Sequence, residues 1–174
     1  MVTIFAFIVQ FVVYCLLACF HSIARAVPVN YILLTVFTVC EAYLVAGICV
    51  FYTANSVIAA AGMTAGLTIV LTMYAFWTKR DFTVFGGAIC IVSFALMCVI
   101  FMSAFMDFPS WWHPVLSAVL VILYGFFLIY DTQLLAGGHK YSLDLDEYIL
   151  GAMMIYIDII MIFVELLKLF GDRD

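Results

Sequence analysis

Four acidic side chains lie within or beside long apolar runs of this sequence: Glu41, Asp131, Asp158 and Glu165. If such a run crosses a membrane, each ionisable group costs roughly 2.5 to 3.5 kcal/mol on insertion scales. A buried carboxylate is neutralised by a proton, by a Lys or Arg partner, or by a bound cation. The four acids therefore indicate proton or cation chemistry inside the protein.

The surrounding sequence distinguishes the acids from one another. Lys168 lies three residues after Glu165 on the same predicted helix face, so an ion pair and a functional role are both open for Glu165. Asp158 has no local base and lies about 16 Å along its helix from Glu147, close to mid-membrane. Asp131 leads into the loop before that helix, so antiparallel packing is expected to bring Asp131 and Asp158 together.

Two aspartates at one site could share a single proton, which would make them a pH-sensitive pair. Their oxygens are also the ligand type that Ca²⁺ prefers, so Asp131 and Asp158 are candidate Ca²⁺ ligands. The structural alternative is that Asp131 ends a helix and Asp158 makes a buried hydrogen bond. Glu41, in "FTVCEAYLVAG", is left without an assigned role.

The composition sets the environment in which these acids act. The chain has 174 residues, 69% hydrophobic and 10% charged, with a mean hydropathy of +1.29. An ordinary globular domain is about half apolar and about a quarter charged. Inside a bilayer only helices or a closed barrel satisfy the backbone. Unbroken apolar runs of twenty or more residues favour helices over the alternating pattern of barrel strands.

Six runs are long enough to cross a bilayer, which takes roughly 17 to 25 residues. They are expected at 3–22, 29–52, 55–77, 83–106, 112–133 and 147–169. The links between them are short, so the sequence predicts an all-α, polytopic bundle that forms a single transmembrane domain over 1–174. Consecutive helices are expected to be antiparallel neighbours.

The basic residues predict an orientation. Four of the six Lys and Arg fall on one side: Arg25, Lys79, Arg80 and Lys140. The positive-inside rule makes that side cytosolic, or the matrix side in a mitochondrial membrane. Both chain ends are then expected on the opposite side. An endomembrane (ER or Golgi) and the mitochondrial inner membrane both remain open as the host.

Several function classes are disfavoured. A net charge of −5 without a basic patch argues against nucleic acid, and no polybasic run for anionic lipid is present. The six cysteines lie in apolar runs without a CxxC pair and are interpreted as small packing residues. No HExxH, GxSxG or glycine-rich phosphate loop occurs, and His21, His113 and His139 are isolated. No enzyme activity and no cofactor are predicted, apart from Ca²⁺ as a permeant ion.

Longer motifs carry a resemblance. "GFFLIYDTQLLAGG" followed by "DEYILGAMMIYIDIIMIFVELLKLFG" resembles the C-terminal signature of the transmembrane Bax inhibitor motif family. "PVNYILLTVFTVCEAYLVAGICVFY" and "MYAFWTKRDFTVFGG" are similar to its Lifeguard branch. The resemblance implies a helical bundle with a central last helix, Ca²⁺ leak across organelle membranes, and restraint of cell death.

The resemblance also implies roles for individual residues. Asp131 of "IYDTQ" and Asp158 of "YIDII" would form a paired pH sensor that gates a cation path near the cytosolic side. Arg25 is the nearest match to a basic residue that latches onto this pair. Glu41 matches the acid of the Lifeguard "FTVCEA" stretch.

In one respect the sequence departs from the family pattern. The family usually has seven helices, and the similarity here begins at the second, which implies that the first helix is absent. Two functions are therefore expected as alternatives. One is a pH-sensitive Ca²⁺ leak channel linked to Ca²⁺ homeostasis. The other is a non-transporting accessory subunit of a larger membrane complex, such as a mitochondrial one, in which partner helices fill the vacant position.

Overall fold

The apolar runs of the sequence form long helices in the computed structural model, which describes residues 1–103, 105–106, 108–138 and 140–173. Six of these helices are long and apolar enough to cross a membrane. They are α1 (Val2–Cys19), α3 (Val29–Cys49), α4 (Ala54–Trp77), α5 (Gly86–Ser103), α6 (Trp112–Ala136) and α7 (Tyr148–Phe170). The predicted all-α polytopic membrane bundle is thus confirmed. His139 lies outside the described residues.

Short elements join these helices. They are the helix α2 (His21–Ala24) and the 3₁₀ turns η1 (Thr83–Phe85) and η2 (Leu145–Glu147). α6 ends at Gly137, whose φ of 71° lies in the left-handed region that favours glycine. This turn directs the chain across the end of the bundle toward α7.

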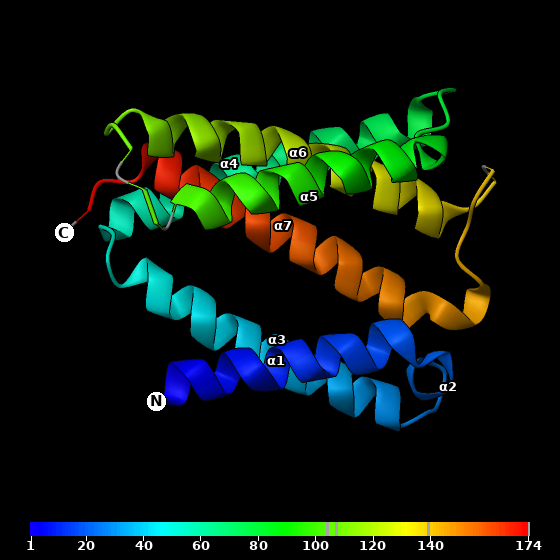
Figure 1. Cartoon of the computed structure of the whole chain (residues 1–174). Helices are drawn as coiled ribbons and strands as arrows, with labels where there is room; N and C mark the ends of the chain where they lie inside the picture. The colour runs from blue at the N-terminus through cyan, green and yellow to red at the C-terminus, as the bar shows by residue number, and fades with distance from the viewer. Residues whose placement is uncertain (104, 107, 139, 174) are drawn as a thin grey trace.

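α7 is the central helix, as expected. It packs on α6, α4 and α3. In Figure 1 it runs diagonally between the pair formed by α1 and α3 and the group formed by α4, α5 and α6. Both chain ends lie at one end of the bundle, which we call the terminal face. The opposite end, which carries Arg25, Lys79, Arg80 and Lys140, we call the Arg25 face.

The expectation that all consecutive helices are neighbours is wrong. α1 packs on α3 and α6 packs on α7, but over the described ranges α3 with α4 and α4 with α5 make at most marginal contact. α4 instead packs on α6 and α7. A short link fixes only where two helix ends meet. In lipid, close packing and polar contacts determine which helices pack along their length.

Two clusters of buried side chains hold α3 against α7. Toward the Arg25 face, Val13 and Leu17 of α1 and Phe37 of α3 pack around Met153 of α7. At the terminal face, Tyr52, Ala60 and Leu167 form a second cluster, on which the end of α3 packs. α1 takes part in the first cluster only, so the three helices are closed near the Arg25 face and leave space nearer the terminal face.

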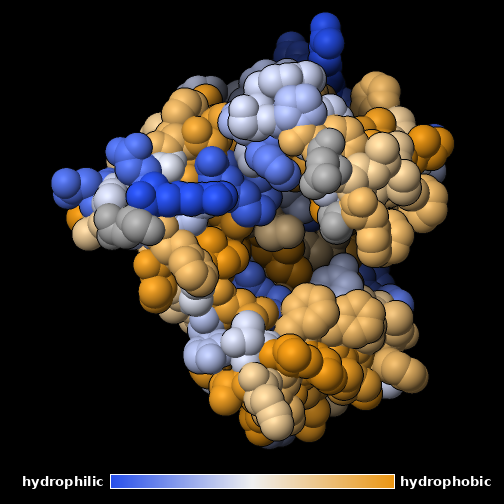
Figure 2. All heavy atoms as spheres, turned by 60° about the vertical axis from the view of Figure 1, so that its left-hand side comes forward, coloured by the Kyte–Doolittle hydropathy of each residue, from blue (hydrophilic) through white to orange (hydrophobic). Residues whose placement is uncertain are grey.

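The surface is largely apolar, as expected for a protein surrounded by lipid. Figure 2, turned so that the terminal side of Figure 1 comes forward, shows broad hydrophobic areas and a hollow between two masses, with hydrophilic atoms visible inside it. Many large apolar side chains are exposed, including Phe5, Phe76 and Phe94. The chain is an integral membrane protein with a partly polar interior.

Candidate functional site

The structure brings Asp131 and Asp158 together. Asp131 lies in the last turns of α6, and Asp158 lies near the middle of α7. Only 5% of each residue is exposed, and the two carboxyl groups lie within hydrogen-bonding reach of each other. The loop between α6 and α7 reverses the chain, so two residues 27 positions apart meet across the most extensive helix interface of the bundle.

The pair has little to neutralise it. Asp131 Oδ1 and Asp158 Oδ2 are enclosed without a hydrogen-bond partner, and in the described part of the chain no Lys, Arg or His forms an ion pair with either residue. Two adjacent carboxylates cannot both remain charged and unpaired in such surroundings. The geometry therefore suits a shared proton or a bound cation.

A cation at the pair would need further ligands. No group of three or more His, Cys, Asp or Glu side chains that could hold a metal ion occurs among the described residues. Ca²⁺ takes six to eight oxygens, so most of them would be water.

The latch candidate Arg25 contacts acids other than the aspartate pair. Its Nη2 donates to Asp144 Oδ2 and to Glu147 Oε1, each at 3.0 Å. The hydrogen bond to Glu147 is the main cause of a raised pKa of the Arg25 guanidinium. In this structure the latch candidate therefore contacts acids at the start of α7. The half-exposed side chain of Arg25 remains in contact with water while its guanidinium binds these two acids.

Sequence reasoning missed the other members of this cluster. His21 Nε2 lies 3.3 Å from Glu147 Oε1, and Asp144 and Glu147 form a capping box around η2. We call His21, Arg25, Asp144 and Glu147 the charge cluster. The available signal was the acidic "DLDE" stretch before an apolar helix, a pattern typical of a helix N-terminus.

Glu165 and Lys168 form the predicted ion pair on α7. Lys168 Nζ donates to Glu165 Oε1 at 2.6 Å. Glu165 is 4% exposed, whereas the Lys168 side chain is 41% exposed. Lys168 thus balances the buried carboxylate of Glu165, while its own side chain is partly exposed toward the terminal face.

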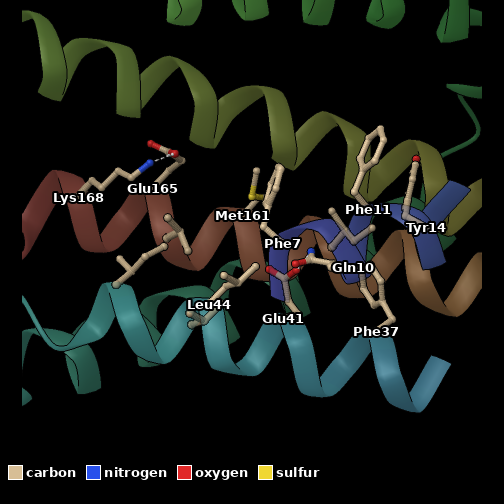
Figure 3. A pocket seen from close by; sticks show the side chains of 14 residues that line it. Phe7, Gln10, Phe11, Tyr14, Phe37, Glu41, Leu44, Met161, Glu165 and Lys168 are labelled. Atoms are coloured by element: carbon tan, nitrogen blue, oxygen red, sulfur yellow. Dashed lines mark hydrogen bonds and ion pairs between the residues drawn. The ribbon is translucent and has the colours of Figure 1, made fainter. Parts of the chain in front are cut away.

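Glu41 lies in α3, opposite α1, and accepts a hydrogen bond from Gln10 Nε2. Figure 3 shows the ends of the two side chains side by side in the lining of a cavity of about 350 Å³ between α1, α3 and α7. Glu165 and Lys168 also line this cavity, as does Tyr14. Gln10 was not singled out from the sequence, although a polar residue inside "FAFIVQFVVYC" was the available signal.

A second polar residue missed in the sequence is Gln133, two positions after Asp131. Its Nε2 donates to the carbonyl oxygens of Ala75, at 3.3 Å, and Arg80, at 3.0 Å, and its Oε1 accepts from Phe82 N at 2.8 Å. Gln133 thereby ties the link between α4 and η1 to α6, one turn from the aspartate pair.

Comparison with known proteins agrees with this architecture. The family model described as "Inhibitor of apoptosis-promoting Bax1" matches residues 1–174. Protein lifeguard 3 of Homo sapiens is 37% identical over 166 residues, which cover 94% of this chain and 53% of that protein. Protein lifeguard 3 of Mus musculus is 36% identical over 172 residues, or 97% of this chain and 56% of the relative.

Protein lifeguard 4 of Mus musculus is 34% identical over 144 residues, or 81% of this chain and 57% of that protein. The chain therefore spans about half the length of the curated relatives it matches. With a family match along its whole length and six membrane-spanning helices, the chain belongs to the Bax inhibitor family and resembles its Lifeguard members.

Proposed function

We propose that this protein provides a pH-sensitive leak path for Ca²⁺ across its membrane, in which Asp131 and Asp158 form the gate. The observation that carries the proposal is the buried contact between these two carboxyl groups, which no described basic side chain neutralises. Nothing in the proposal requires an enzymatic step.

The gate works through proton occupancy. While the two aspartates share one proton, they stay together and the path past them is closed. Loss of that proton leaves two like charges in a poorly solvated site, and their repulsion favours separation. The separated carboxylates then offer oxygens to a partly hydrated Ca²⁺ ion.

The charge cluster at the Arg25 face closes the same end of the bundle. Arg25 bridges the segment after α1 to the acids at the start of α7. Separation of these helices would break the bridge. We therefore infer that the charge cluster adds to the stability of the closed state.

The family description refers to inhibition of an apoptosis-promoting protein. A Ca²⁺ leak that lowers the load of a storage organelle would restrain death signals that depend on Ca²⁺ release. The basic Arg25 face is proposed as the cytosolic side. The proposal thus links Ca²⁺ homeostasis to restraint of cell death.

Flux through reconstituted vesicles tests the function. Phosphatidylcholine liposomes that contain the protein and a trapped fluorescent Ca²⁺ indicator should admit Ca²⁺ faster as the pH rises from 6 to 8. Asp158→Asn should flatten this dependence, because the pair can no longer lose the shared proton. Flux no greater than that of empty liposomes at every pH would overturn the proposal.

A second candidate is a non-transporting accessory subunit of a larger membrane complex. The observation that favours it is α5, in which no described residue is fully buried and which contacts α6 only lightly. Apolar side chains such as Ile91 and Phe94 are more than 60% exposed. Partner helices could pack on this surface.

Native gels after mild detergent extraction separate the two candidates. A subunit should migrate only within a large complex, and its purified form should carry no Ca²⁺ flux. Migration as a monomer or small oligomer would count against the subunit role and leave the leak path as the better account.

A further inference from the structure

The cavity between α1, α3 and α7 contains a polar site that the aspartate gate does not use. It occupies the half of these helices nearer the terminal face, with Tyr14 toward its inner end and Lys168 toward the terminal face, as Figure 3 shows. Most of its lining is apolar. Glu41 and Gln10 lie between the two ends and are held together by a hydrogen bond.

The hydrogen-bonding capacity of this site is incomplete. Gln10 Nε2 is used by Glu41, but Gln10 Oε1 is buried and has no partner among the described residues. A buried amide oxygen without a donor costs about 1 to 3 kcal/mol. Lipid chains that reach the cavity cannot supply a donor, whereas a water molecule or a hydrated cation can satisfy this oxygen.

The charges that line the cavity favour a cation. Glu165 is balanced by Lys168 at 2.6 Å, whereas the only partner of Glu41 in the described part of the chain is the neutral amide of Gln10. The lining therefore carries one unbalanced carboxylate. Within the cavity, Glu41 and Gln10 supply two oxygens, and a volume of about 350 Å³ has room for the water that completes a Ca²⁺ shell.

Tyr14 is shared by the cavity and the surroundings of the aspartate pair. Tyr14 lines the cavity, and its hydroxyl lies within electrostatic range of both Asp131 and Asp158. On α7, Tyr156 lies within the same range of Glu41 and is two residues from Asp158. The proposed path from the Glu41 site to the aspartate pair therefore runs past the phenol group of Tyr14.

We infer that Gln10 and Glu41 form a second cation-binding site, which collects a divalent ion from the terminal face before it reaches the aspartate gate. The inference rests on the proposed leak function, since the second site would form the part of the leak path between the terminal face and the aspartate gate. It assigns to Glu41 the role of ion ligand and to Gln10 the roles of ligand and positioning group for the carboxylate.

Terbium luminescence tests the site without relying on flux. Tb³⁺ is an oxygen-seeking substitute for Ca²⁺ that emits when excited through a nearby tyrosine, and Tyr14 and Tyr156 lie beside the site. The full chain in nanodiscs of phosphatidylcholine, a lipid without net charge, should show tyrosine-sensitised emission that is lost when Ca²⁺ displaces the bound Tb³⁺. Glu41→Gln keeps an oxygen for Gln10 and should lower the Tb³⁺ affinity at least tenfold.

Two further variants sharpen the test. Gln10→Glu adds a second carboxylate and should raise the Tb³⁺ affinity several-fold. Asp146→Asn, which removes an exposed acid at the Arg25 face, is the matched control and should change nothing. Equal Tb³⁺ affinity in the wild-type protein and Glu41→Gln would overturn the inference, as would loss of binding in Asp146→Asn alone.

Flux measurements separate this inference from the proposed function. In liposomes, Glu41→Gln should lower the Ca²⁺ flux several-fold and raise the Ca²⁺ concentration needed for half-maximal flux, while its pH dependence stays that of the wild type. Asp158→Asn should alter the pH dependence instead. If no variant conducts but Tb³⁺ still binds through Glu41, the leak function fails and the cation site stands.

Discussion

Arg25 Nη2 and Glu147 Oε1 lie 3.0 Å apart and join the segment that follows α1 to the start of α7. Glu147 is largely buried, whereas 39% of the Arg25 side chain is exposed. The contact lies beyond the aspartate pair on the Arg25 face (Figure 1), so on the proposed leak path a cation that leaves the pair on that side would meet this ion pair next.

Arg25→Ala is expected to raise Ca²⁺ flux at neutral pH by several-fold, because it removes the bridge between α1 and α7. The melting temperature should change little, since half-exposed ion pairs contribute little to stability. The measurement is indicator flux in liposomes together with thermal unfolding in detergent. Exchange of the charges in the double variant Arg25→Glu/Glu147→Arg should restore low flux, and failure to do so would contradict the gating role.

The stability of the protein should fall as the pH rises through the range in which the aspartate pair loses its shared proton. The native state holds a proton there that the unfolded chain releases at the same pH, so the stabilisation is present at low pH and lost at high pH. Thermal unfolding in detergent between pH 5 and 8.5 measures this. Asp131→Asn and Asp158→Asn should each give a flatter profile, and an unchanged slope in both would exclude a shared proton.

Gln133→Leu should destabilise the fold by about 1 to 3 kcal/mol, because it leaves the half-buried Phe82 amide and two carbonyl oxygens without the Gln133 side chain as partner. The link between α4 and α5 should then become more accessible to limited proteolysis. Ser142→Ala, an exposed change at the same face, serves as the control. Equal stability of the two variants would mean that water replaces the Gln133 contacts.

Lys168→Met should lower stability by about 1 to 3 kcal/mol, since Glu165 is left buried without its cation. The double variant Glu165→Gln/Lys168→Met should recover most of the loss, because both charges are then absent. A double-mutant cycle from thermal unfolding gives the coupling energy. Coupling near zero would show that the terminal face hydrates Glu165 in place of the lysine.

The sequence predicted the helices well because each is an apolar run close to the length of a bilayer crossing. It also predicted that Asp131 and Asp158 would meet, since a short loop forces antiparallel packing of the two helices that carry them. The Glu165 and Lys168 pair followed from helical spacing alone. These features depend on local sequence or on one loop.

Other features required the three-dimensional structure. The partners of Arg25 lie more than 110 positions away in the sequence. The contact between Gln10 and Glu41 likewise joins two different helices, so local sequence could not predict it. The neighbours of α4 were predicted wrongly, since it packs on α6 and α7 and not on the helices next to it in sequence. Lipid is as apolar as the helix surfaces, so hydrophobicity does not determine which apolar face packs against another helix.

The placement of α1 gives the lipid a direct part in the site. The N-terminal half of α1 bounds the cavity and reaches the cluster that fastens the other half only through the partly buried side chain of Val9. A change in bilayer thickness would therefore act first on this more lightly packed half, so that the surrounding membrane itself would set how wide the cation entrance stands.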